Sequence, residues 1–240
     1  MFDILPAIDL LGGRVVRLEQ GDFDRETAFS DDPVAVAVAF ADAGARWLHV
    51  VDLDGARAGS PVHGDVIGQI VAAVGARCSV EVAGGLRSAE AVAAALGAGA
   101  ARAVVGTAAL RDLGFASRLI ADHGKDRIAV ALDVRAGRAV GDAWRTGVDG
   151  PSVDDALARL HGEGVRTFEV TAIDRDGLLG GPDLSLYEHL AALRLGSIIA
   201  SAGVASVADI DAVRELGCTG AIIGRALYDG RLSLAEALGA

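Results

Sequence analysis

The 240-residue chain has few cysteines, a single lysine and no apolar run long enough to cross a membrane. Two thiols, Cys78 and Cys218, do not make a disulfide framework, so we expect both to be buried and reduced in a cytoplasmic protein. The only lysine, Lys125, lies in the polar stretch HGKDR. This argues against Schiff-base chemistry, which needs a desolvated lysine. The N-terminus has no basic, signal-like segment.

Basic residues are also scarce, because 22 Lys and Arg stand against 33 Asp and Glu, for a net charge of −11. This balance argues against nucleic acid or an anionic membrane as a partner. The sequence shows no Walker-type phosphate loop, no serine–histidine nucleophile pattern and no metal-ligand spacing. An anionic substrate must therefore be held by local groups, such as backbone N–H groups and a few arginines.

Short apolar runs alternate with amphipathic stretches along the whole chain. Runs that are apolar throughout are typical of parallel strands buried on both faces. They are Ile4–Ile8, Trp47–Val51, Cys78–Ala83, Ala101–Val105, Ile128–Leu132, Thr167–Ile173, Ser197–Ala200 and Gly220–Ile223, with helical patterns such as Pro33–Ala43, Ser88–Ala98, Val153–Gly162 and Ser206–Leu216 between them. Eight strand–helix units predict the α/β class and a single (β/α)8 TIM barrel over residues 1–240. A doubly wound open sheet is the second architecture that this pattern allows.

The sequence also repeats itself. Residues 80–110 realign on residues 198–228 with a constant offset, which places Gly85 on Gly203 and Gly106 on Gly224. Residues 44–55 likewise match residues 164–177, and Asp9 falls on Asp133 at the start of each half. The repeat predicts two half-barrels, about 1–124 and 125–240. Because one chain would hold both halves, it is compatible with a monomer.

In a barrel of this type, reactive groups follow the carboxyl ends of the strands. Carboxylates cluster after the first, second, fifth and sixth strands, and glycines cluster after the others. We expect Asp9 and Asp133 to face one substrate from opposite sides, and the glycine turns to bind a phosphate at each of its ends. Candidate binding residues are Arg17, Gly84, Gly85, Arg87, Gly106, Thr107, Gly203, Gly224 and Arg225, with Thr171 and Asp176 after the sixth strand.

Other polar residues near the strand ends favour structural roles. Asp52 and Asp54 are as well explained by loop capping or ion pairing as by chemistry. His49 is expected to be a hydrogen-bonded core residue. The remaining histidines, His63, His123, His161 and His189, are expected at the surface.

Several motifs together resemble the histidine-biosynthesis isomerase family (HisA). They are LPAIDLLGGRVVRL, WLHVVDLDGA, GGLRS, VVGTAAL, ALDVRAGRAV, DRDG and IIGRALYDG, and they cover essentially the whole chain. The resemblance implies conversion of the bis-phosphorylated ribonucleotide ProFAR to PRFAR by an Amadori rearrangement, without cofactor or metal. It implies Asp9 as general base and either Asp133 or Asp176 as general acid. Gly177 and Ala202 match family positions at the substrate site.

The chain departs from the family pattern at Ala83, Ala172, Leu178 and Ala202, and Ala202 should narrow the second phosphate turn. A related branch that also isomerises phosphoribosylanthranilate has Ser and Arg where this chain has Ala83 and Asp142. Asp142 would repel the anthranilate carboxylate. Two further functions suit the same fold. The chain could be the sister cyclase of this family, but Arg17 stands where the cyclase has a lysine. It could also be a non-catalytic barrel that binds a bis-phosphate without converting it.

Overall fold

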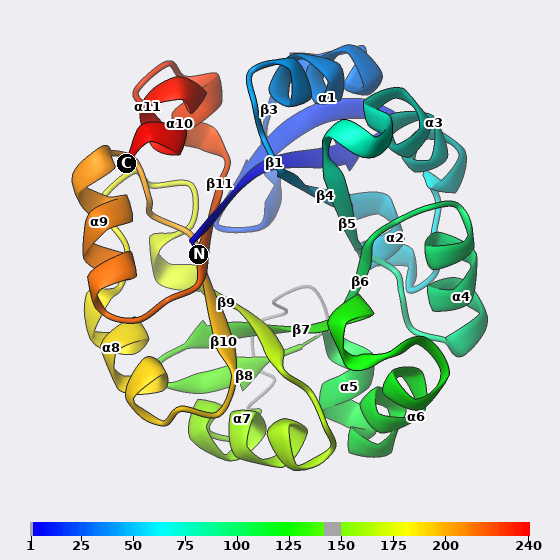
Figure 1. The fold of residues 1–240 in the computed structure, drawn as a ribbon, viewed down its shortest axis with the longest axis vertical. Coiled ribbons are helices and arrows are strands. Elements are labelled where there is room, and N and C mark those ends of the chain that lie inside the picture. Colours follow the sequence, from blue (N-terminus) through cyan, green and yellow to red (C-terminus); the bar gives the residue numbers. More distant parts are fainter. Residues whose placement is uncertain (1, 142–149) are drawn as a thin grey trace.

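The computed structural model describes residues 2–141 and 150–240. Within them, parallel strands form a ring that closes where the last strand pairs with the first (Figure 1). Around the ring they are β1 (Asp3–Leu11), β4 (Trp47–Asp52), β5 (Ser79–Ala83), β6 (Arg102–Val105), β7 (Ile128–Arg135), β9 (Thr167–Ala172), β10 (Ser197–Ser201) and β11 (Gly220–Ile223). The closed ring confirms the predicted (β/α)8 barrel and excludes the open sheet.

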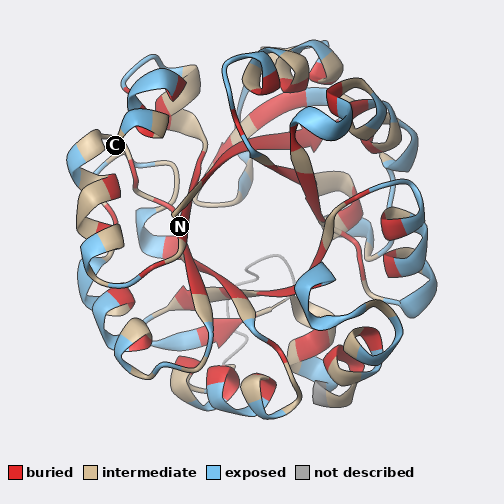
Figure 2. Cartoon of the chain, viewed as in Figure 1, coloured by how far each residue is buried: buried red, intermediate tan, exposed pale blue. Residues whose placement is uncertain are grey.

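Helices surround the ring of strands (Figure 1). They are α1 (Pro33–Asp42), α2 (Leu53–Ala58), α3 (Gly64–Val74), α4 (Ala89–Gly97), α5 (Thr107–Arg111), α6 (Leu113–His123), α7 (Val153–Gly162), α8 (Leu184–Ala192), α9 (Val207–Glu215), α10 (Arg225–Tyr228) and α11 (Leu234–Gly239). Figure 2 shows their buried faces turned towards the strands and their exposed faces outwards. None of these helices combines the length and the apolar character that crossing a membrane would require, within the residues described.

The helix starts follow the local sequence signals. Asp32 caps α1 by accepting a hydrogen bond from the Ala35 N–H at 2.9 Å, and Pro33 occupies the first turn. Ser88 and Ser206 cap α4 and α9 in the same way, one in each half of the chain. The four helical stretches predicted above therefore agree with the observed helices to within one residue at each end.

Three strands outside the ring were not predicted. β2 (Arg14–Glu19) and β3 (Asp22–Ser30) form an antiparallel hairpin on the end of β1, and β8 (Arg138–Val140) pairs with the end of β7. β3 has the sequence DFDRETAFS and is largely exposed, so it has none of the apolar alternation that marks a half-buried strand. The hairpin extends over the carboxyl ends of the barrel strands.

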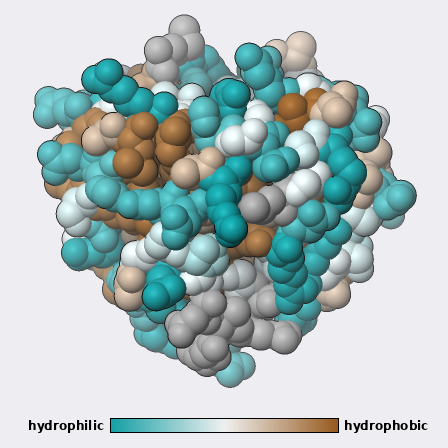
Figure 3. All heavy atoms as spheres, turned by 90° about the horizontal axis from the view of Figure 1, so that it is seen from below, coloured by the Kyte–Doolittle hydropathy of each residue, from teal (hydrophilic) through white to brown (hydrophobic). Residues whose placement is uncertain are grey.

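The main core lies between the strands and the helices, and a smaller cluster fills the inside of the ring. That inner cluster consists of Leu5, Ala7, Ile199 and Ile222, packed against Trp47. Cys78 and Cys218 are both buried and free, as predicted. On the outer surface, Figure 3 shows hydrophobic side chains in small groups among hydrophilic ones.

The buried hydroxyl of Tyr187 on α8 hydrogen-bonds the backbone of two strands, β9 and β10. Tyr187 is fully buried, and its Oη lies 2.6 Å from the Ser201 carbonyl oxygen and 3.1 Å from that of Val170. The same oxygen accepts a hydrogen bond from the Ser201 N–H at 3.2 Å. Ser201 ends β10 at the mouth of the barrel, so this contact also fixes the edge of the cavity described below.

We expect Tyr187→Phe to lower the free energy of unfolding by about 1–3 kcal/mol, because buried backbone groups lose their partner. Urea unfolding measures the effect. Glu188→Gln, at the exposed neighbouring position, is the control and should leave the midpoint unchanged. An unchanged midpoint in Tyr187→Phe would show that the hydroxyl is not needed.

Candidate active site

The pairing register arranges the side chains inside the ring in two layers. Because residues i and i+2 of a strand face the same side, each mouth residue lies above a second inward-facing residue. The mouth layer comprises Asp9, Val51, Ala83, Asp133, Thr171 and Ser201, and the floor layer comprises Ala7, His49, Glu81, Ala131, Glu169 and Ile199. The functional residues of both layers are therefore positioned by hydrogen-bonded strands.

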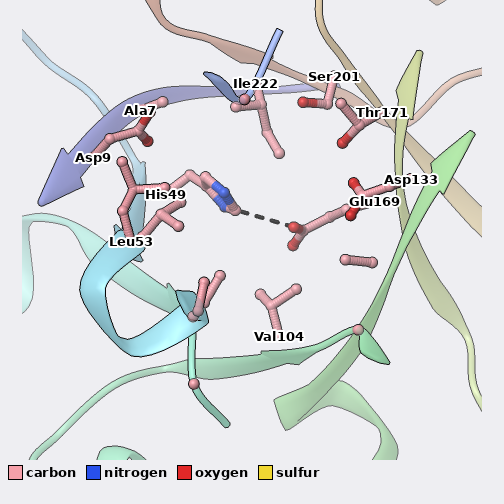
Figure 4. Close-up of a pocket in the computed structure, with 18 of the residues that line it drawn as sticks. Ala7, Asp9, His49, Leu53, Val104, Asp133, Glu169, Thr171, Ser201 and Ile222 are labelled. Atoms are coloured by element: carbon pink, nitrogen blue, oxygen red, sulfur yellow. Dashed lines mark ion pairs between the residues drawn. The ribbon is translucent and has the colours of Figure 1, made fainter. Parts of the chain in front are cut away.

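A cavity of about 240 Å³ opens at the carboxyl ends of the strands. Figure 4 shows Asp9 and Asp133 on opposite sides of it, as expected for two carboxylates acting on one molecule. The predicted site residues that line it are Asp9, Arg17, Gly84, Gly85, Arg87, Gly106, Thr107, Asp133, Thr171 and Asp176. The predicted residues Gly177, Ala202, Gly203, Gly224 and Arg225 are not among its lining residues.

Asp9 and Arg17 form an ion pair at the mouth. Arg17 projects from the β2–β3 hairpin, and its Nη1 lies 2.8 Å from Asp9 Oδ2. Both side chains are largely buried. Arg17, a candidate binding residue from the sequence, thus lies in the cavity wall. Its Nε is buried without a hydrogen-bond partner among the described residues.

Arg17 also covers the glycine turn that follows β11. A Cβ atom added to Gly224 would lie 2.3 Å from Arg17 Cζ, so only glycine allows the guanidinium to pack there. This packing explains why Gly224 does not line the cavity although it lies beside it. Arg17 thus joins Asp9 to the phosphate-binding turn predicted in the second half of the chain.

Asp176 faces the same region from the loop after β9. Burial raises the pKa of its carboxyl to about 6, the Arg17 guanidinium opposes this rise, and the neighbouring carboxylates Asp9 and Asp133 add to it. Asp176 is therefore able to hold a proton near neutral pH, whereas Asp9 is paired with a cation. The two carboxyl groups differ in environment as an acid and a base require.

The glycine turns of the two halves share one backbone geometry. Gly84 and Gly85 have φ values of +95° and +73°, and Ala202 and Gly203 have values of +81° and +82°. A Cβ on Gly85 would lie 2.7 Å from the Ser60 carbonyl carbon, and one on Gly203 would lie 2.3 Å from the Gly181 carbonyl oxygen. Both turns therefore need glycine for the same reason, a close approach of backbone.

The turns after the fourth and eighth barrel strands match as well. Gly106 has φ −113° and ψ −96°, and Gly224 has φ −112° and ψ −99°. Each is followed by a short helix, α5 or α10. The two halves thus present equivalent backbone N–H groups on opposite sides of the barrel mouth.

Arg87 and Arg225, the two predicted arginines beside these turns, donate hydrogen bonds to backbone carbonyl groups. Arg87 Nη2 donates to the Ala56 carbonyl at 2.8 Å, and Arg225 Nη1 donates to the Gly177 carbonyl at 2.7 Å. A Cβ on Gly177 would lie 3.1 Å from the Leu18 carbonyl oxygen, so Gly177 allows its loop to lie against the β2–β3 hairpin. Arg225 and Gly177 therefore hold loops in place next to the second turn.

The floor of the cavity is charged. His49 Nδ1 lies 2.6 Å from Glu81 Oε1 and 3.6 Å from Glu169 Oε2, and Arg102 Nε donates to Glu81 Oε2 at 2.8 Å. Burial opposes protonation of His49, but Glu169 and Glu81 outweigh it and raise the pKa of His49 to about 9. His49 is hydrogen-bonded and buried as predicted, and it also lines the cavity (Figure 4).

Donor atoms of His49, Glu81 and Glu169 lie within 4.8 Å of one another, so among the described residues this is the group with a spacing compatible with a metal ion. Glu81, however, already accepts hydrogen bonds from His49 and Arg102. An ion bound there would have to break the His49–Glu81 contact and lie beside the Arg102 cation. The donor set therefore fits a metal poorly.

The carboxylates after β4 have structural partners. Asp52 is buried and accepts hydrogen bonds from the backbone N–H groups of Gly55, Val62 and His63, at 2.7–2.8 Å. Asp54 accepts from the Gly12 N–H at 2.7 Å and pairs with His63 Nε2 at 2.7 Å. The expectation that His63 lies at the surface was wrong, since Asp54 holds its side chain in a largely buried position.

Residues 3–233 match a family model described as "Histidine biosynthesis protein". The chain belongs to the histidine biosynthesis family. It is 47% identical to a protein of Roseiflexus castenholzii over 238 residues, 99% of each chain. It is 46% identical to one of Thermomicrobium roseum, covering 95% of this chain and 93% of the relative, and 42% identical to one of Xanthomonas euvesicatoria, covering 99% and 98%. All three are named 1-(5-phosphoribosyl)-5-((5-phosphoribosylamino)methylideneamino) imidazole-4-carboxamide isomerase.

Sequence reasoning missed Glu81, Glu169 and Ser201 in this member of the histidine biosynthesis family. A signal was present for the first two, because each is a charged residue at an inward-facing position of an otherwise apolar strand. Ser201 gave none, since a serine at a strand end is common. Asp142, which was expected to repel an anthranilate carboxylate, lies outside the described residues.

Ala202 has the left-handed backbone conformation that its counterpart Gly84 adopts without strain. We expect Ala202→Gly to raise the free energy of unfolding by about 0.5–1 kcal/mol, because the strain outweighs the added freedom of the unfolded chain. Thermal unfolding measures it. Ala205 has no positive φ, so Ala205→Gly should lower the free energy of unfolding. Equal destabilisation in both variants would contradict the strain at Ala202.

The raised pKa of Asp176 should also appear in the pH dependence of stability. Its folded-state value of about 6 lies above the ordinary 3.8, so the folded protein binds more protons between these values and loses stability as pH rises through them. Asp176→Asn should flatten this part of the stability–pH curve, with urea midpoints recorded from pH 4 to 7. The exposed Asp174→Asn serves as control. If the stability–pH curve of Asp176→Asn has the same slope as that of wild type, another group must cause the pH dependence.

Proposed function

We propose that this chain is the isomerase that converts ProFAR to PRFAR in histidine biosynthesis, a small phosphorylated ribonucleotide being its substrate. The observation that carries this proposal is the near full-length identity to relatives named as this isomerase. The site supports it, because the rearrangement needs one acid and one base on a single sugar. Asp176 and Asp9 line one cavity in environments that differ as those roles require.

In the first step, the protonated Asp176 carboxyl gives its proton to the ring oxygen of the aminoaldose. The bond between C1 and the ring oxygen breaks, and the nitrogen lone pair forms a C=N bond. Asp176 is preferred to Asp133 as the acid because its pKa lies at about 6, close to the operating pH. Asp133 lies on the side of the cavity opposite Asp9 (Figure 4), and its proposed role is to bind the hydroxyl groups of the sugar.

In the second step, the Asp9 carboxylate removes the proton from C2. The electrons of that C–H bond form a C1=C2 double bond, and the nitrogen regains its lone pair, giving an enolamine. Proton transfer from the C2 hydroxyl and to C1 then yields the ketose. Arg17 holds the Asp9 carboxylate in place, because its guanidinium contacts that carboxylate at 2.8 Å.

One phosphate binds at each glycine turn, with Gly84, Gly85, Gly106 and Thr107 at one end and Ala202, Gly203 and Gly224 at the other. The matching backbone geometry of the turns supports this assignment. At the second turn, the unpartnered Nε of Arg17 is available as a further donor. The half-barrels 1–124 and 125–240, a monomeric state and a cytoplasmic location stay predictions.

Purified protein should convert ProFAR to PRFAR in buffer containing EDTA, and Asp9→Asn should lose activity by at least about 1,000-fold because the base is removed. Chromatographic separation of substrate and product measures both. Asp174→Asn, on the same loop as Asp176 but exposed and 3.7 Å from Arg135, should keep full activity. Turnover by Asp9→Asn at the wild-type rate would remove Asp9 from the mechanism.

The same preparation distinguishes the isomerase from the other functions that suit this fold. Phosphoribosylanthranilate should not be turned over, since the branch that accepts it has Ser where Ala83 lines this cavity. Consumption of PRFAR with ammonia would instead indicate the sister cyclase. Tight binding of ProFAR without conversion would indicate a binding protein.

A further inference from the structure

A carboxyl oxygen at the floor of the cavity has no partner. Glu169 is 2% exposed, and its Oε1 makes no hydrogen bond among the described residues. The chain places this side chain inside the ring because Phe168 and Val170, on either side of it, face the helices and are buried in the main core. A buried polar atom without a partner costs free energy, so its presence calls for an explanation.

The neighbouring ions do not supply that explanation. Glu81 is the carboxylate that satisfies His49 and Arg102, with contacts of 2.6 Å and 2.8 Å. The hydrogen bond and charge of His49 and the charge of Arg102 outweigh burial and lower the pKa of Glu81. Glu169 is thus a second carboxyl beside cations that Glu81 already engages. It shares a hydrogen bond with the Glu81 carboxyl, and its Oε2 lies 3.6 Å from His49 Nδ1, so Oε1 is the atom left without a partner among the described residues.

The cavity reaches Glu169 because its floor-layer neighbours are small. Ala7 and Ala131 line the cavity at the level of His49 and Glu169, whereas Glu81 and Arg102 are not among the lining residues. Figure 4 shows His49 and Glu169 pointing towards one another. A molecule gripped at the mouth therefore has open space down to this pair.

We propose that Glu169 is a substrate-binding residue whose Oε1 hydrogen-bonds a hydroxyl of the sugar between the two phosphates, while His49 holds its other oxygen. The inference rests on the proposed function and adds a contact to it below Asp9 and Asp133. A sugar hydroxyl both donates and accepts, so it satisfies the orphan oxygen in either protonation state.

The electrostatic surroundings of Glu169 are compatible with binding an anionic substrate. Burial and the adjacent Glu81 carboxylate raise the pKa of Glu169 well above its usual range, against the opposing charges of His49 and Arg102. These groups come from β4, β5 and β6, and Asp133 of β7 adds a further acidic group in the cavity above. A raised pKa favours the protonated carboxyl, which repels an anionic substrate less than a carboxylate does.

The test compares two substitutions at this position. Glu169→Gln keeps the shape and the ability to donate, so KM for ProFAR should stay within about threefold of wild type. Glu169→Leu keeps an apolar volume but no hydrogen bond, so KM should rise about tenfold or more. The melting temperature of Glu169→Leu should not fall, because a buried carboxyl without a full set of partners does not stabilise the fold.

Inorganic phosphate is the matched probe, since it occupies the glycine turns but not the floor. Its inhibition constant should be the same in wild type and in both variants. A KM in Glu169→Leu equal to wild type, or an equal rise in both variants, would overturn the inference while leaving the proposed function intact. Wild-type protein that does not convert ProFAR would overturn both.

Discussion

The hydrogen bonds between β1 and β11 are the constraint on which the site depends. They close the sheet, and closure turns the alternating inward residues of eight strands into stacked layers around one axis. Asp9 on β1 and Asp133 on β7 then face a common space although 124 positions separate them in the chain. In an open sheet the same residues would lie along an edge, and their carboxylates could not act on opposite sides of one sugar.

The two halves are alike in backbone and different in side chains. Their glycine turns have similar dihedral angles, but only the turns of the first half line the cavity, since Arg17 packs against Gly224 in the second. The hairpin β2–β3 breaks this equivalence, because it brings Arg17 to the second turn only. The proposed substrate, with a phosphate at each end, would thereby meet similar backbone turns at its two ends and unlike side chains at its central sugar.

An acidic protein that takes an anionic substrate must control where its own negative charges lie. Here the mouth pairs Asp9 with Arg17, and burial leaves Asp176 with a pKa of about 6. On the floor, Glu81 is paired with His49 and Arg102, and burial together with the Glu81 carboxylate raises the pKa of Glu169. Burial and charged neighbours thus give the carboxyl groups around the cavity different surroundings.

The sequence alone determined the barrel, the order of its eight ring strands, and ten of the residues that line the cavity, because apolar periodicity and glycine turns are local signals. It did not reveal β3, whose polar residues carry no periodic signal, or the buried position of His63, which a distant Asp54 stabilises. Nor could it separate Asp133 from Asp176 or mark Glu169 as facing the cavity. Those properties depend on burial and on contacts between strands far apart in the chain, and only closure of the barrel creates both.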